Sequence, residues 1–158
     1  MTTPKTIRVS PHKCIGCLNC ELGCAMRDWG EFFPSPPKIN LVFFKDGGGV
    51  PVTCFQCDNA PCLAVCQTGA LARDESGVIA SDPRRCVGCG ACAAVCPFGN
   101  VVYDRKGKRV LKCDQCGGEP RCVKACPSGA LKYEDDTDAV KARREAFARA
   151  LKAAGELS

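Results

Sequence analysis

The chain has 158 residues, of which 16 are Cys, whereas its aromatic residues are seven Phe, two Tyr and one Trp. So few large apolar side chains argue against a large hydrophobic core, and the cysteine content is far above that of ordinary intracellular domains. The formal net charge is +5 with every Cys counted as neutral, which by itself would suit a nucleic-acid surface.

The N-terminal residues, MTTPKTIRVSPHKC, contain neither an apolar run nor a small-residue cleavage site, so the sequence predicts no secretory leader. No stretch of the chain reaches the roughly 18 apolar residues of a membrane helix. We therefore expect a cytoplasmic protein without direct membrane insertion. In that compartment, dense cysteine indicates metal or redox chemistry rather than disulfides.

All 16 Cys fall into four groups of four, each of which opens with C-x2-C and closes with x3-C. The middle gap is two residues in groups one and three, four residues in group two and five in group four. In chain order the groups are Cys14, Cys17, Cys20 and Cys24; Cys54, Cys57, Cys62 and Cys66; Cys86, Cys89, Cys92 and Cys96; and Cys113, Cys116, Cys122 and Cys126.

This spacing is typical of [4Fe-4S] ligation, because a C-x2-C-x2-C loop wraps one cluster while the fourth Cys is carried away by a helical turn. The sequence therefore predicts four [4Fe-4S] clusters with all 16 Cys as iron ligands. Sixteen thiolates on four cores of charge +2 add about −8, so the loaded chain would carry about −3. The basic excess then balances the clusters, and we expect no nucleic-acid partner.

Zinc binding, disulfides and metal storage fit the cysteines less well. Zinc sites usually separate two C-x2-C pairs by about 12–20 residues, whereas each group here is much tighter. A disulfide scaffold needs an oxidising compartment. A thiol-rich metal buffer has no use for the strand-like segments and the C-terminal helix. A structural zinc-binding protein remains the remote alternative.

Short strands are expected after the cysteine groups. Groups two, three and four are each followed by a Gly three residues after the last Cys, which permits a tight reversal of the chain. The next residues predict two hairpins that join groups two to three and three to four, made of Ala70 to Arg73 with Val78 to Ala80, and of Val101 to Asp104 with Arg109 to Lys112.

Residues 25–53 form the longest insertion between groups. Three prolines at 34, 36 and 37 break any helix there. Ile39 to Phe44 is expected to be a strand, and the glycines at 47–49 a flexible turn. A set of mainly bulky side chains either covers the first cluster or docks a partner: Asp28, Trp29, Phe32 and Phe33.

The polar residues near the cysteines have two interpretations. His12 lies two residues before Cys14, but the groups are complete, so we expect it near the ligands or at the surface. Four residues inside the ligand loops either tune the clusters or are simply solvated: Asp58, Asn59, Asp114 and Gln115.

Residues 136–158 are expected to form an amphipathic helix, clearest from Asp136 to Glu156. An apolar stripe contains Val140, Phe147, Leu151 and Ala154, and much of the remaining surface is basic. The helix either packs on the cluster domain or docks a larger subunit. A membrane-surface role is disfavoured by its small apolar face.

The four-group pattern, with wider gaps in groups two and four, resembles the four-cluster ferredoxin subunits of the DMSO-reductase type over about residues 6–135. Such subunits serve molybdenum and tungsten oxidoreductases, formate dehydrogenases, hydrogenases and carbon monoxide dehydrogenases. The chain is also similar in size and plan to the small ferredoxin subunits of bacterial tungsten aldehyde oxidoreductases. The resemblance implies an α+β fold of tandem bacterial-ferredoxin-like halves, with residues 1–135 as the cluster domain and residues 136–158 as an added helix.

The resemblance also implies a nested ligand scheme, in which groups one and four form one half and groups two and three the other. Pairing one with two and three with four is the simple alternative, and spacing does not choose between them. The nested sets are Cys14, Cys17, Cys20 with Cys126; Cys113, Cys116, Cys122 with Cys24; Cys54, Cys57, Cys62 with Cys96; and Cys86, Cys89, Cys92 with Cys66.

We expect electron transfer rather than catalysis. No nucleophile triad, phosphate-binding glycine loop or nucleotide motif is present. The favoured function is an iron–sulfur subunit that links a large metallo-oxidoreductase catalytic subunit, of the molybdenum or tungsten type, to a further electron-accepting or electron-donating subunit. The alternative is a free-standing polyferredoxin shuttle. Self-association into an end-to-end chain is a further open partner arrangement.

Overall fold

The computed structural model describes residues 5–29, 36–45, 47–135, 142 and 145–150. Within these residues, short strands pair into two-stranded antiparallel sheets, and short helices alternate with them along the chain. The fold class is mixed α+β, as the resemblance implies.

The strands form three local hairpins and one pairing between distant segments. The hairpin that joins groups three and four has the predicted bounds, and the one before it begins one residue later in each strand than predicted. The strand expected at 39–44 is present. Its partner strand, which begins at Gly49, was not predicted, because the glycines at 47–49 resemble a flexible turn. The pairs are β1 (Lys5–Val9) with β8 (Leu131–Asp135), β2 (Asn40–Phe43) with β3 (Gly49–Val52), β4 (Leu71–Arg73) with β5 (Ile79–Ser81), and β6 (Val101–Asp104) with β7 (Arg109–Lys112).

Each cysteine group contains a helix that carries its third Cys. Three are single turns, α2 (Pro61–Ala64), α3 (Ala91–Ala94) and α4 (Arg121–Lys124), and the chain reverses after them at glycines with φ of 62°, 63° and 65°. The helix of group one, α1 (Asn19–Trp29), has 11 residues. It continues because neither Pro nor Gly follows Cys24 to end it.

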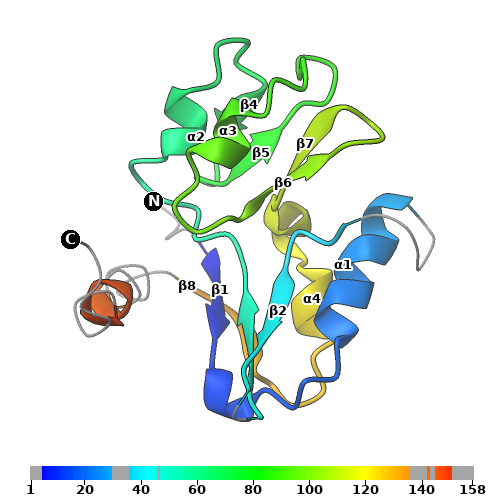
Figure 1. The fold of residues 1–158 in the computed structure, drawn as a ribbon, viewed down its shortest axis with the longest axis vertical. Helices are drawn as coiled ribbons and strands as arrows, with labels where there is room; N and C mark the ends of the chain where they lie inside the picture. Colours follow the sequence, from blue (N-terminus) through cyan, green and yellow to red (C-terminus); the bar gives the residue numbers. More distant parts are fainter. Residues whose placement is uncertain (1–4, 30–35, 46, 136–141, 143–144, 151–158) are drawn as a thin grey trace.

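The pairing of β1 with β8 brings the first and last cysteine groups together, because β1 precedes group one and β8 follows group four. In Figure 1, β1, β8, α1 and α4 lie together in the lower part of the molecule, and α2, α3 and β4–β7 form the upper part. Helices α1 and α4 approach closely, since a Cβ added at Gly23 would lie 3.2 Å from the Cβ of Ala125.

The core consists of two groups of buried residues, each of which contains cysteines, and Cys54 of group two joins the one that holds groups one and four. One buried cluster joins Cys20, Cys54, Cys113 and Cys122 to Ile7, Ile39 and Leu131. The other joins Cys62 and Cys92 to Ala60, Leu71, Ile79, Val101 and Val110.

Residues 145–150 are helical, and the Phe147 ring packs edge-on against Phe98 with 5.2 Å between centroids. Phe98 in turn contacts Phe55, with 4.5 Å between ring centroids. Through Phe147, this part of the predicted C-terminal helix contacts the turn that follows group three, although residues 145–150 are themselves exposed. The rest of residues 136–158 lies outside the described residues, as do Phe32, Phe33 and the side chains of Asp28 and Trp29. None of the described helices has the length and apolar character that crossing a bilayer requires.

Candidate metal centres

The residue before the second Cys has a left-handed backbone in all four groups. It is Gly16 (φ 71°) and Gly88 (φ 67°) in groups one and three, and Gln56 (φ 48°) and Gln115 (φ 54°) in groups two and four. This conformation turns the C-x2-C loop back on itself, which is how two cysteines so close in sequence can share one centre. The glycines were recognisable as a signal in the sequence, whereas the two glutamines were not, because Gln rarely adopts this conformation.

In the half built from groups two and three, cysteines of both groups line the same cavities. One cavity of about 240 Å³ is lined by Cys86, Cys89 and Cys92 together with Cys66. A narrower one is lined by Cys54, Cys57 and Cys62 together with Cys96. In each cavity, three cysteines of one group meet the fourth cysteine of the other.

In the half built from groups one and four, the thiols influence one another electrostatically. Burial raises the pKa of Cys20 to about 11, and negative charge at Cys126 adds to the rise. Burial also raises the pKa of Cys122, to which charges at Cys113, Cys24 and Cys116 contribute. Here too, the fourth cysteine of each group lies near cysteines of the other: Cys126 near Cys20, and Cys24 near Cys113 and Cys122.

Hydrogen-bond donors point at the cysteine sulfurs. The main-chain N–H groups of Lys38 and Asn100 donate to Cys24 Sγ and Cys96 Sγ, both at 3.3 Å. The hydroxyls of Thr68 and Ser128 lie 3.7 Å from Cys66 Sγ and Cys126 Sγ. These four sulfurs belong to the fourth Cys of the four groups. In every group, therefore, the fourth cysteine has a hydrogen-bond donor beside its sulfur.

These surroundings fit [4Fe-4S] clusters, which carry negative charge on sulfur and accept N–H and O–H hydrogen bonds. The donor sets are all thiols, and the cavity around Cys54 is lined mainly by apolar side chains. In addition, Gln115 is 1% exposed, and its Nε2 has no acceptor within the part of the chain that the structure describes. A buried N–H donor without a protein acceptor is what a sulfide-rich group would satisfy.

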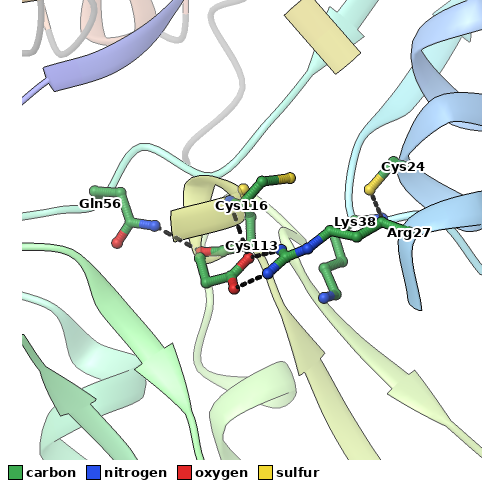
Figure 2. A network of polar contacts seen from close by, with 7 residues as sticks. Cys24, Arg27, Lys38, Gln56, Cys113 and Cys116 are labelled. Carbon is green, nitrogen blue, oxygen red and sulfur yellow. Dashed lines mark hydrogen bonds and ion pairs between the residues drawn. The ribbon is translucent and has the colours of Figure 1, made fainter. Parts of the chain in front are cut away.

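Two contacts join the loops of different groups, as Figure 2 shows. Gln56 Nε2 donates to the carbonyl oxygen of Cys113 at 2.6 Å. Arg27 of α1 forms a bidentate ion pair with Asp114, in which Nη2 donates to Oδ2 at 2.8 Å. Burial alone would raise the pKa of Asp114, but the hydrogen bond and charge of Arg27 outweigh it, so the pKa is lowered.

The four loop residues differ in their surroundings. Asp58 and Asn59 are exposed, as is His12, which lies in the 3-10 helix Pro11–Lys13. In contrast, Asp114 pairs with Arg27, and Gln115 is buried and accepts a 3.2 Å hydrogen bond from the Tyr133 hydroxyl. Contacts with residues distant in sequence decided this division, so no local pattern predicted it.

The cysteines differ in exposure. Of the 16, all of which the structure describes, Cys17 and Cys89 alone are exposed, and near them in sequence lie the exposed apolar residues Ile15 and Val87. Cys54 and Cys113 are buried. Among the described residues, no three His, Cys, Asp or Glu side chains are arranged to hold a single metal ion.

Comparison with protein families matches residues 48–136 to the 4Fe-4S dicluster domain and residues 11–27 to a 4Fe-4S binding domain. The chain belongs to the 4Fe-4S dicluster domain family. Family membership establishes the type of cofactor as [4Fe-4S], in agreement with the donor sets described above.

Curated relatives carry electron-transfer names. The chain is 39% identical over 86 residues to the polyferredoxin-like subunit of an aliphatic sulfonate oxidoreductase from Pyrococcus furiosus, covering 54% of this chain and 50% of the relative. It is 39% identical over 87 residues to the thiosulfate reductase electron transfer subunit PhsB of Salmonella typhi, covering 49% and 44%. The chain thus spans about half the length of these relatives.

Among solved structures, the active-site complex BamBC of benzoyl coenzyme A reductase in complex with zinc matches 82% of this chain and 77% of its own. The TM-score is 0.46 and the sequence identity 26%.

Proposed function

We propose that this chain conducts electrons through four [4Fe-4S] clusters held by the nested cysteine sets. The observation that carries the proposal is the grouping of thiols. In the half of groups two and three, three cysteines of one group line a cavity with the fourth cysteine of the other, and in the other half Cys126 lies near Cys20 and Cys24 near Cys122. A cluster bound by four thiolates leaves no iron position for substrate, so it supplies one-electron transfer rather than catalysis.

The exposure of the cysteines supports an order for the four centres. The two sets that contain Cys17 and Cys89 reach the surface, whereas Cys54 and Cys113 belong to inner sets, and negative charge at Cys54 adds to the rise that burial causes in the pKa of Cys113. Electrons would then enter and leave at the ends held mainly by groups one and three. They would cross between the halves from the set of group four to the set of group two.

We infer that the chain works as a subunit of a larger oxidoreductase complex. Relatives are named as subunits of a sulfonate oxidoreductase and of thiosulfate and tetrathionate reductases. The exposed apolar residues Ile15 and Val87 lie near the two exposed ligand cysteines, where partner subunits could approach the terminal clusters. A molybdenum- or tungsten-type catalytic subunit is the partner that these relatives favour, and cytoplasmic location stays part of the proposal.

The experiment is an anaerobic reductive titration of the native protein, followed by size-exclusion chromatography of a native extract. We expect uptake of about four electrons per chain and magnetic interaction between neighbouring reduced clusters. Co-migration with a large metalloenzyme supports the subunit. Free elution of the loaded chain would support the shuttle instead, and a chain that takes up no electrons would refute both.

A further inference from the structure

Lys112, the last residue of β7, is buried with 1% exposure and directly precedes Cys113. Its Nζ donates a 3.0 Å hydrogen bond to Cys54 Sγ and a 3.3 Å hydrogen bond to Gln56 Oε1. The side chain also lines the cavity that Cys54 shares with the other thiols of its set. A lysine attached to the group-four loop thus reaches a sulfur of group two.

A buried ammonium group is costly unless negative charge compensates it. Within the described part of the chain, none of the ion pairs involves Lys112. Its hydrogen-bond acceptors are a neutral amide oxygen and the Cys54 sulfur. The compensating negative charge must therefore come from the Cys54 thiolate and the centre to which that thiolate belongs.

We propose that Lys112 is a positioning residue that acts through the Cys54 sulfur to raise the reduction potential of the cluster bound by Cys54, Cys57, Cys62 and Cys96. The inference rests on the proposed function. Reduction adds one electron from the neighbouring centre and takes the cluster with its four thiolates from about −2 to about −3. No bond or proton moves, and a fixed positive charge nearby stabilises the more negative state.

The contact is specific to this set of thiols. Burial raises the pKa of Cys62, and the positive charge of Lys112 is the strongest influence that opposes the rise. Burial also raises the pKa of Cys113, but there Lys112 is the weakest of the influences that shift it. In other sets, Cys24 receives its hydrogen bond from a neutral main-chain N–H, and Cys66 lies beside a neutral hydroxyl.

The test is a redox titration of the cluster-loaded protein, monitored by electron paramagnetic resonance, for Lys112→Gln and Lys112→Arg. Lys106→Gln is the matched control. Lys106 is exposed in the turn of the same hairpin, so this variant also removes one positive charge, but one that is solvated. We expect Lys112→Gln to shift the reduction equilibrium of one cluster at least tenfold toward the oxidised form, which is about 59 mV for one electron. Lys112→Arg should restore most of the potential, and Lys106→Gln should change none.

A second measurement covers the case in which the Lys112 variants fail to load. In wild-type protein whose lysines carry 15N at Nζ, the electron paramagnetic resonance of a reduced cluster should show a hyperfine coupling to the Nζ of Lys112. Unchanged potentials in loaded Lys112→Gln, or no coupling in fully reduced wild type, would overturn the role of Lys112. Wild type that lacks clusters altogether would instead refute the proposed function.

Discussion

The side-chain amide of Gln56 donates a 2.6 Å hydrogen bond to the main-chain carbonyl oxygen of Cys113. The same side chain accepts a 2.9 Å hydrogen bond from the main-chain N–H of Ile79. One residue of the group-two loop therefore ties together the two halves of the molecule at the place where the proposed inner centres meet. Its left-handed backbone conformation places it there at an energetic cost.

Replacing Gln56 with Leu should lower the stability of the loaded protein by about 1–3 kcal/mol, because the carbonyl of Cys113 and the N–H of Ile79 lose their partner. The midpoint of anaerobic urea denaturation measures the change. Gln67→Leu is the control, since Gln67 is exposed. Equal midpoints for the two variants would show that the tie between the halves contributes nothing.

The nested ligand scheme makes a prediction about Cys126. In that scheme Cys126→Ser should damage the same cluster as Cys17→Ser, because both cysteines belong to the set of group one. The variants should lose the same component of the electron paramagnetic resonance spectrum of the reduced protein. If Cys126→Ser instead removes the component lost in Cys89→Ser, groups three and four are paired and the nested scheme is wrong.

The sequence predicted the local structure better than the long-range structure. The β6–β7 hairpin was found because an RKGK turn separates two runs of strand-forming residues, and the turns after Cys96 and Cys126 were marked by glycine. The pairing of β1 with β8 was missed, since it joins residues such as Ile7 and Tyr133 that no short pattern connects. The metal type followed from cysteine spacing alone.

The polar residues around the cysteines were the least predictable part. A lysine such as Lys112 is normally exposed, and only the approach of β7 to the group-two loop buries it. The sequence did not distinguish Asp114 from the other polar loop residues, because its partner Arg27 lies in α1, far away along the chain. Arg27 lies in the last part of α1, beyond Cys24. The contact with Asp114 therefore depends on the absence of a Pro or Gly after Cys24, which would have ended the helix there.

Gly88 should tolerate no side chain. A Cβ there would lie 1.9 Å from the carbonyl oxygen of Lys108 in the β6–β7 turn, and its φ is +67°. We expect Gly88→Ala to lose the cluster of group three, seen as a fall in iron per chain. Gly117→Ala shares the left-handed backbone, with φ +64°, but has open space around it. It should cost only about 1 kcal/mol and keep its iron.

Removing the clusters should unfold most of the chain. Both groups of buried core residues contain cysteines, and few large apolar side chains would remain to hold the halves together. Far-ultraviolet circular dichroism before and after anaerobic chelation of iron measures the effect, and the signal of ordered structure should largely disappear. A chelated, colourless chain that keeps its spectrum would show that the clusters are not needed for folding.

The most direct test of the account is the content of iron and acid-labile sulfide in anaerobically purified protein. Four clusters of four irons predict about 16 iron and about 16 sulfide per chain, with no other metal in stoichiometric amount. About half of those values would mean that only one half of the molecule is loaded as proposed. Stoichiometric zinc without sulfide would contradict the account altogether.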